Sequence, residues 1–380
     1  MRRALVLGEA LVDLLDTPDP AAPEPAGPQR PGPDRPGPDR PGPDRPDPEP
    51  AGSEPPGVAL GRRVFRPAPG GAPLNVAVGV ARLGGAVDLV GAVGADALGD
   101  RLVAFLATAG VGTSALRRVA TPTALAVTTF TGAEPEFRFY GEPPSYAEFG
   151  PADVDLDAVA GAAAVSCGSI ALLRPGPLAA ARRAWAVPGP WRVFDPNVRP
   201  ALLTGPAPAH GAASAPAAAP GPAAADVRAL TEEFAATADL VKLSAADAAL
   251  LYPGLAADAV LDRLRAAGAR AVLLTRGARA ALLAVGDDRL RAAAPSTRVV
   301  DTTGAGDAVQ AAVIVRVLAQ GPPAGLAAWR DCLVFALRVA ALVCESPGGA
   351  ASMPTRSAVA ARFDPTAAAG PGPADPPAGW

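Results

Sequence analysis

The sequence predicts an α/β fold in which helices cover both faces of an open, mostly parallel β-sheet. Short runs of Val, Leu and Ala alternate with longer helix-like segments over residues 62–200, and the alternation resumes at residue 240. Glycine-rich or polar segments follow several of these runs directly, at the carboxyl ends of strands where ligands bind in such folds. Aromatic residues make up only 4% of the chain, so we expect a core of small aliphatic side chains.

The expected elements begin with a short buried strand at 4–8. Further strands are expected at 86–93, 123–131, 136–140, 191–194, 240–243, 271–275 and 298–300, and helices at 73–83, 97–109, 305–319 and 324–344. Gly84 and Gly110 directly follow the first two helices, as is typical of helix C-termini.

Three segments are too rich in Pro and Ala to pack. Residues 17–61 repeat the unit PGPDR, 204–225 form a second insert, and 357–380 form a tail. Dense Pro lacks amide donors and disfavours helix, so we expect polyproline-like or disordered excursions. For 17–61 we favour a tolerated loop expansion over a protein-docking arm. The chain is therefore expected to hold one domain, 1–356, with two inserts and a tail.

The composition restricts the possible chemistry. A net charge of −3 without a basic block argues against a nucleic-acid partner. The only histidine, His210, lies in the second Pro/Ala-rich insert, so a His-based triad or a His-rich metal site is excluded. The only lysine, Lys242, does not follow a GxxxxG loop, so a P-loop enzyme is excluded as well.

The cysteines and the N-terminus indicate a reducing, cytoplasmic setting. Cys167, Cys332 and Cys344 lack CxxC spacing, so buried free thiols are expected. Two arginines followed by apolar residues resemble a signal peptide, but Glu9 and Asp13 interrupt the apolar run. No membrane partner is expected, because no Pro-free apolar segment is long enough to cross a bilayer.

The segment DTTGAGD, residues 301–307, joins an expected strand to an expected helix. The N–H groups of Gly304, Ala305 and Gly306 would lie at the helix start, where unpaired donors and the helix dipole favour an anion. Asp307 could accept a proton from a substrate hydroxyl while these amides stabilise a transferring phosphoryl group. The alternative is a helix-start carboxylate with a favourable dipole interaction of about 0.3–1 kcal/mol.

A second glycine-rich segment precedes the helix expected at 73–83. Gly70 and Gly71 would let a ligand approach the backbone, and Asn75 would bond a hydroxyl; the alternative is a tight turn with an Asn cap. Asp13, after the first strand, would either grip ligand hydroxyls or be a solvated strand-end charge.

Together these segments resemble the ribokinase/PfkB family of carbohydrate kinases, and its fructokinase-like branch in particular. The matching segments stand in family order: LVLGEALVDLL, GGAPLNVAVGVARLGGAVDLVGAVGADALGDRL, FRFYGEPPSYAEF, FDPNVRP, LVKLSAADAALL, VLLTRGARAALL, VVDTTGAGDAVQAAVI and AALVCESPGGAASMPT. The resemblance implies a three-layer α/β/α ribokinase-like fold with a small β-sheet lid from segments near 10–16, 62–68 and 123–140. It also implies ATP as donor, Mg²⁺, often a monovalent cation such as K⁺, and often a homodimer formed through the lid.

The resemblance assigns roles by position. It implies that Asp307 is the base, with an anion hole of Gly304, Ala305 and Gly306. It implies sugar contacts for Asp13, Gly70, Gly71 and Asn75. The nucleotide side would comprise Asn197, Lys242, Thr275 and Gly277, with Gly304 and Gly306. Metal or cation contacts are implied for Asp247, Asp301, Ser346, Gly349 and Ser352. For Lys242 a plain strand-end charge is the alternative.

Two departures from the family pattern leave details open. The usual Asn-x-x-Glu magnesium motif is Ser244-Ala245-Ala246-Asp247 here, and the shorter Asp247 would reach a metal only through water or would merely cap a helix. In the lid segment, Gly141 stands where related sugar kinases frequently carry Arg, which loosens the inference to fructose.

The expected function is ATP-dependent transfer of a γ-phosphoryl group to a primary hydroxyl of a sugar, with fructose the first candidate. Within the same chemistry, 2-keto-3-deoxygluconate, ribose or a nucleoside are alternatives. From another class, the chain could be a catalytically weak ligand-binding protein on the kinase scaffold. The intact Asp307 and GAGD segment argue against that reading.

Overall fold

The computed structural model describes residues 2–18, 63–131, 134–203 and 222–364 of the 380-residue chain. Most of the inserts expected at 17–61 and 204–225, and most of the tail expected at 357–380, lie outside the described residues. None of the described helices is long and apolar enough to cross a membrane.

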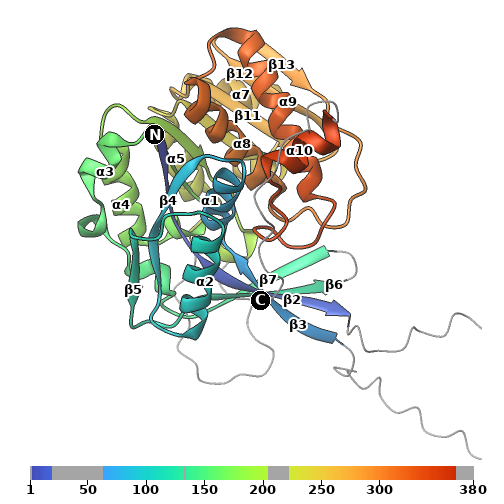
Figure 1. Cartoon of the computed structure of the whole chain (residues 1–380). Helices are drawn as coiled ribbons and strands as arrows, with labels where there is room; N and C mark the ends of the chain where they lie inside the picture. Colours follow the sequence, from blue (N-terminus) through green and yellow to red (C-terminus); the bar gives the residue numbers. More distant parts are fainter. Residues whose placement is uncertain (1, 19–62, 132–133, 204–221, 365–380) are drawn as a thin grey trace, which may run out of the picture.

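The described part of the chain folds around a nine-stranded sheet with the order β13-β12-β11-β10-β9-β8-β1-β4-β5 (Figure 1). The strands are β1 Arg3–Leu7, β4 Ala86–Gly94, β5 Leu116–Val119, β8 Ala164–Gly168, β9 Trp191–Asp195, β10 Leu240–Ser244, β11 Ala271–Arg276, β12 Arg279–Val285 and β13 Asp288–Ala292. Neighbours from β5 to β11 pair in parallel, and only the β11–β12 and β12–β13 pairs are antiparallel. The predicted mostly parallel sheet is confirmed.

Helices cover both faces of this sheet, and a separate apolar cluster forms on each face. One cluster includes side chains of α1 Ala72–Arg82, α2 Ala97–Thr108, α8 Ala305–Gln320, α9 Gly325–Val343 and α10 Arg356–Phe363. The other includes side chains of α3 Leu156–Gly161, α4 Pro175–Trp185, α5 Ala224–Ala235, α6 Ala245–Leu251 and α7 Ala257–Ala266. Short 3₁₀ helices lie at Ser145–Glu148, Pro151–Asp153, Ile170–Leu173 and Pro200–Leu202.

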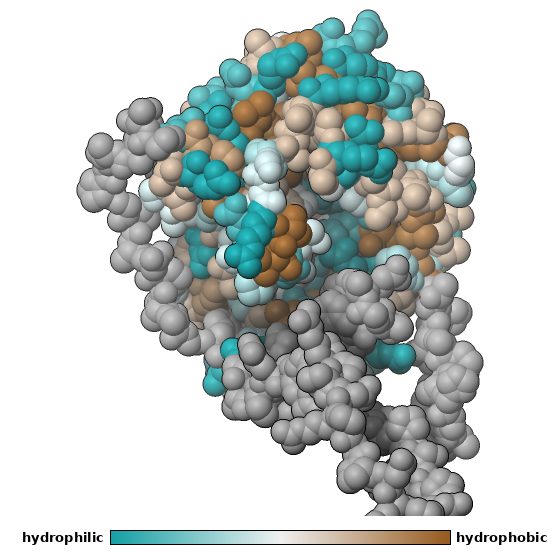
Figure 2. Space-filling model, turned by 90° about the vertical axis from the view of Figure 1, so that its right-hand side faces the viewer, coloured by the Kyte–Doolittle hydropathy of each residue, from teal (hydrophilic) through white to brown (hydrophobic). Residues whose placement is uncertain are grey.

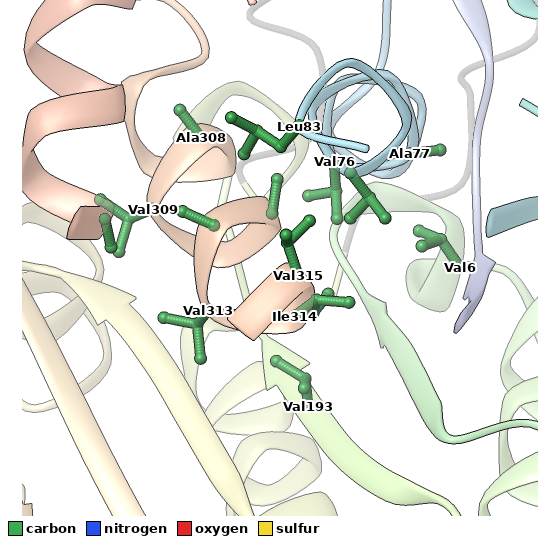
Figure 3. Close-up of a cluster of buried hydrophobic side chains, with 14 of the residues drawn as sticks. Val6, Val76, Ala77, Leu83, Val193, Ala308, Val309, Val313, Ile314 and Val315 are labelled. Carbon is green, nitrogen blue, oxygen red and sulfur yellow. The ribbon is translucent and has the colours of Figure 1, made fainter. Parts of the chain in front are cut away.

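Close packing of α1 against α8 fixes the positions of their first turns. Figure 3 shows Val76 of α1 facing small aliphatic residues of α8, among them Val315 and Ile314. The two helices approach so closely that a Cβ added to Gly79 of α1 would lie 2.7 Å from the Ala311 Cβ of α8. A core of this density transmits small displacements, so the N-termini of α1 and α8 hold a fixed relative position.

A second sheet forms the lid, with the strand order β3-β2-β6-β7. Its strands are β2 Leu11–Pro18, β3 Arg63–Gly70, β6 Leu125–Thr131 and β7 Glu134–Tyr140. The β2–β3 and β6–β7 pairs are antiparallel and β2–β6 is parallel. In Figure 1 this sheet extends from the lower side of the main body. It contains the segments from which the sequence predicts a lid.

The prediction of a strand at 298–300 is wrong. Val299 and Val300 are 60% and 52% exposed, and within the described residues this segment pairs with no strand. Instead, the N–H groups of Val300 and Asp301 donate to the carbonyl of Cys344 after α9, at 2.8 and 3.3 Å. The β-branched residues favour a strand locally, but the edge of the sheet is taken by the β12–β13 hairpin, a region where the sequence predicted no element.

The tail expected to start at residue 357 is also corrected, because its first residues form α10. Thr355 caps this helix by accepting the N–H of Ala358 at 3.2 Å. Val359 is 3% exposed and belongs to the core, and Phe363 packs against it. Residues 356–364 contain no Pro, and the Pro-rich composition begins only at Pro365, so this stretch can form a helix.

Candidate active site

Asp307 lies in the first turn of α8 and is 5% exposed. Its Oδ2 accepts a hydrogen bond from Nδ2 of Asn75 at 2.8 Å, and its Oδ1 accepts one from Nδ2 of Asn197 at 3.1 Å. Asn75 lies on α1, and Asn197 follows β9 in a left-handed conformation with φ 39°. Three residues predicted from distant segments therefore meet, with the carboxylate held as an acceptor between two amide donors.

The start of α8 presents backbone donors beside this carboxylate. Gly304 precedes the helix in a left-handed conformation with φ 79°, and its carbonyl accepts the N–H of Ala308 at 2.8 Å. The N–H groups of Gly306 and Asp307 belong to the first turn, where a helix offers no carbonyl one turn back. Such a helix start favours a bound anion. Figure 2 shows a hollow on one side of the molecule, with hydrophilic residues at its back and both hydrophilic and hydrophobic residues around its rim.

The residues predicted to shape a cation site form a connected loop. One oxygen of Asp301 accepts the N–H and hydroxyl of Thr303 at 2.9 and 2.8 Å, and the other accepts the N–H of Gly348 at 3.0 Å. The Ser352 hydroxyl donates to the Gly349 carbonyl at 3.0 Å. The Ser346 N–H donates to the Val343 carbonyl at 3.4 Å. Asp301 thus ties the segment before α8 to the loop after α9.

Asp247 caps α6. Its Oδ2 accepts the N–H and hydroxyl of Ser244 at 2.8 and 2.6 Å, while the Ser244 hydroxyl accepts the Asp247 N–H at 3.0 Å. Its Oδ1 accepts the N–H of Val198 at 2.8 Å. This is a capping box, so the capping alternative describes the hydrogen bonds of Asp247, and both of its oxygens are occupied.

Lys242 and Asp195 form a buried ion pair. Their Nζ and Oδ2 atoms are 2.6 Å apart, and their side chains are 3% and 5% exposed. Burial raises the pKa of Asp195 to about 6, although Lys242 opposes the shift. Burial lowers the pKa of Lys242, but the carboxylates of Asp195, Asp307 and Asp247 outweigh it and raise the pKa above its ordinary value. Lys242 is therefore a charged lysine buried in the core, and not the strand-end charge of the alternative interpretation.

The predicted sugar-side residues lie where the lid meets the main body. Asp13 of β2 is paired in register with Ala68 of β3, and its carboxylate lies against Gly70, where an added Cβ would be 2.1 Å from Oδ2. Burial raises the pKa of Asp13 to about 7, with the positive charge of Arg199 opposing the shift. Gly71, at φ 101°, begins α1. Asp13 as a whole is half-buried, so its carboxylate is partly shielded from water beside Gly70.

Two buried acidic residues of this region, Glu9 and Asp195, were not predicted from the sequence as site residues. Glu9, 1% exposed, accepts hydrogen bonds from the Ser169 hydroxyl at 2.7 Å and from the N–H groups of Ala72 and Ala171 at 3.3 and 3.2 Å. It thereby joins the start of α1 to the turn after β8, and burial raises its pKa to about 7. Glu9 follows an apolar strand and Asp195 ends one. An acidic residue at such a position is the sequence signal that could have identified both as site residues.

Thr275 and Gly277 lie at the turn between β11 and β12. The Thr275 hydroxyl donates to the Leu243 carbonyl at 3.4 Å, and Gly277 has φ 59° in open space. They stand two strands from Asp195, at the same edge of the sheet. No described hydrogen bond connects them to Asp307. Among the described residues, no three His, Cys, Asp or Glu side chains are grouped closely enough to hold a metal.

Known proteins are similar to this chain in sequence and in fold. The sequence profile described as "pfkB family carbohydrate kinase" matches residues 56–356. "Fructokinase-1" of Oryza sativa subsp. japonica is 32% identical over 303 residues, covering 77% of this chain and 87% of the relative. "Probable fructokinase-6, chloroplastic" of Arabidopsis thaliana is 31% identical over 308 residues, covering 78% and 74%.

Solved structures give the same picture. The crystal structure of fructokinase with bound ATP from Xylella fastidiosa superimposes with a TM-score of 0.73 at 26% identity, covering 96% of this chain and 99% of that one. An aminoimidazole riboside kinase from Salmonella enterica, solved with its riboside and an ATP analogue, gives 0.69 at 22% identity, covering 94% and 98%; at that identity it supports the fold alone.

Proposed function

The chain belongs to the pfkB family of carbohydrate kinases and is an ATP-dependent carbohydrate kinase, and we propose that it phosphorylates a primary hydroxyl of fructose with Asp307 as general base. The observation that carries the proposed mechanism is the position of Asp307, held between Asn75 and Asn197 at the start of α8. A base must lie where a substrate hydroxyl and the transferring group can meet, and a carboxylate beside helix-start donors meets that need.

In the proposed reaction the sugar hydroxyl donates its proton to Asp307 while its oxygen forms a bond to the γ-phosphorus of ATP. The bond from that phosphorus to the β–γ bridging oxygen breaks, and ADP leaves with the electron pair. The N–H groups of Gly304 and Gly306 stabilise the negative charge on the transferring phosphoryl oxygens. The N–H of Ala305, the third predicted donor, donates to the Thr302 carbonyl at 3.2 Å in the structure and would join them on releasing it. Positioning and charge stabilisation account for most of the catalysis in such a transfer.

On the sugar side we propose contacts from Asp13, Gly70, Gly71 and Asn75. The Oδ1 of Asn75 is buried and has no hydrogen-bond partner within the described residues. Because leaving a buried acceptor unpaired costs about 1–3 kcal/mol, this atom supports a role in accepting a hydrogen bond from the substrate. The nucleotide side is proposed to comprise Asn197, Lys242, Thr275 and Gly277.

Sugar kinases of this family use ATP with Mg²⁺. The residues present fit a magnesium ion held mainly by phosphate oxygens and water, because both oxygens of Asp247 are engaged in the chain and Asp195 is paired with Lys242. Asp247 would then act on the metal through water. When bound, the metal supplies positive charge to the phosphates.

A monovalent cation such as K⁺ is proposed to bind near Asp301 and the loop that contains Ser346, Gly349 and Ser352. The proposed compartment is the cytoplasm, and a homodimer through the lid remains a proposal.

An ATP-consumption screen tests the proposed substrate. We expect the highest kcat/KM for fructose among fructose, 2-keto-3-deoxygluconate, ribose, tagatose 6-phosphate, fructose 1-phosphate and adenosine. A higher value for another compound would move the assignment within the family. Binding of ATP and sugar without any turnover would instead support the ligand-binding alternative.

The pKa of Asp13 predicts how sugar affinity depends on pH. An acid whose pKa is raised to about 7 is protonated below that pH, so it loses the ability to accept two hydroxyl protons as the pH falls. We expect the KM for the sugar to rise about tenfold between pH 8 and pH 6, the change in the ionised fraction of such a group. Asp13→Asn should show a high KM that is flat over this range.

The comparison of the two pH profiles assigns the titrating group. If the rise in KM persisted in Asp13→Asn, it would belong to another acid, such as Glu9 with its pKa of about 7, and the proposed role of Asp13 would be wrong.

A further inference from the structure

The only lysine of the chain lies in the core of the molecule. Lys242 is the third residue of β10, and side chains alternate between the two faces of a strand. Leu240 belongs to the apolar cluster on the α8 face, whereas Val241 and Leu243 belong to the opposite cluster. Lys242 therefore points from β10 toward α8, at a position where the pattern calls for an apolar residue, and fully buried lysines are rare unless paired.

The partner of Lys242 comes from the neighbouring strand by the same alternation. In β9, Trp191 and Val193 belong to the α8-face cluster, and Asp195 ends the strand on the same face. The resulting ion pair is 2.6 Å long, and both side chains are at most 5% exposed. Replacing such a buried pair by apolar residues is often neutral or stabilising, so stability alone does not explain why this pair is here.

The ammonium group is pressed against the backbone of the proposed anion hole. A Cβ added to Gly306 would lie 2.7 Å from Nζ of Lys242 and 3.6 Å from its Cε. Gly306 is in the first turn of α8, one residue before Asp307. The lysine head thus occupies the space beside Gly306 that a side chain would fill, on the core side of the helix start.

Building on the proposed function, we propose that Lys242 belongs to the nucleotide side as the fixed positive charge of the anion hole. It acts from within the core through the backbone of Gly306, without touching the nucleotide itself. Asp195 keeps the ammonium in place. A permanent charge in a water-poor interior acts strongly on charge that develops nearby and needs no reorganisation during the reaction. Lys242 is in this sense a positioning residue of the phosphoryl-transfer step.

The competing explanation is that Lys242 only neutralises Asp195. A double variant separates the two, because Lys242→Met with Asp195→Asn removes both charges and leaves no buried carboxylate without a partner. The amide oxygen introduced by Asp195→Asn can still accept the N–H of Asn197, which Asp195 accepts at 3.2 Å. If Lys242 acts on the transferring group, kcat of the double variant stays at least about 50-fold below wild type although its unfolding temperature recovers relative to Lys242→Met.

The transition-state analogue formed by ADP and aluminium fluoride, with Mg²⁺ and the sugar identified in the screen, gives a readout that folding does not move. We expect its affinity to fall in the double variant by a factor similar to that of kcat, while the KM for the sugar stays within threefold. Lys242→Ala should regain part of its activity when propylammonium is added.

The pair formed by Arg3 and Asp88, 2.6 Å apart, is the control. Arg3 is the first residue of β1 and Asp88 the third of β4, so this pair lies near the amino ends of the two parallel strands, whereas Asp195 ends its strand. Arg3→Met with Asp88→Asn should leave kcat and the affinity for the analogue unchanged. Recovery of wild-type kcat in the Lys242→Met and Asp195→Asn double variant would overturn the inference while leaving the proposed function intact. Absence of turnover by the wild-type enzyme with every sugar would overturn the proposed function instead.

Discussion

Replacing Asp307 by Asn is expected to lower kcat by about 10³-fold or more. General acid–base catalysis typically contributes about 10²–10⁴-fold. The affinities for ATP and for the sugar should change only a few fold. The introduced amide has nearly the shape of the carboxylate but cannot take up a proton. It also places one donor group opposite Asn75 or Asn197, both of which donate to Asp307. Steady-state kinetics and calorimetric titration with ATP and with the sugar measure the two effects separately.

Asp100 provides the control for the alternative interpretation of Asp307. It too is an acidic residue in the first turn of a helix, α2, but its side chain is 74% exposed and pairs with Arg118. If Asp307 only interacted with the helix dipole, both Asn variants would behave alike, losing at most about 0.3–1 kcal/mol of stability. Equal and nearly full activity in the two variants would therefore disprove the catalytic role.

Part of the site could be located from the sequence, because Asn197 follows a strand of the main sheet. The carboxyl ends of parallel strands meet at one edge of a sheet, so a glycine-rich segment after an apolar run marks that edge. Asn75 and Asp307 were placed by the glycine-rich segments before their helices and Asn197 by the family resemblance, although the strand expected before Asp307 is not formed. Hydrogen bonds join the three residues in the structure.

The partners of buried charges could not be predicted, because pairing depends on strand order and register. Lys242 and Asp195 are 47 residues apart, and they meet only because β9 and β10 are neighbours in the sheet. The same limit explains the wrong strand at 298–300, whose β-branched residues express a local preference without revealing a partner. Asp247 is a third example of what local sequence cannot decide, because its spacing from Ser244 suits both a metal-binding motif and a helix cap.

Gly304→Ala is expected to reduce kcat by about 10²-fold, the loss that a displacement of about 1 Å in an active site can cause. Two costs combine at this position. Gly304 has φ 79°, which costs a residue with a Cβ about 1–2 kcal/mol. The added Cβ would also lie 2.8 Å from the Cα of Gly349 and 3.3 Å from its carbonyl carbon and oxygen. These are backbone atoms, so either the first turn of α8 or the loop around Gly349 must move.

Gly254→Ala separates the two costs. Gly254 has φ 80°, nearly the value of Gly304, but a Cβ there would meet no atom within 4 Å. Both variants should therefore lose about 1–2 kcal/mol of unfolding free energy from the backbone conformation, measured by urea denaturation. Only Gly304→Ala should lose a further 1–3 kcal/mol, roughly the cost of overpacking, and only it should lose activity. Since Gly304 carries no side chain, such a loss would have to come from displacement of the helix start relative to Asp307 and its amides. Equal kcat in the two variants would mean that the contact with Gly349 does not hold the anion hole in place.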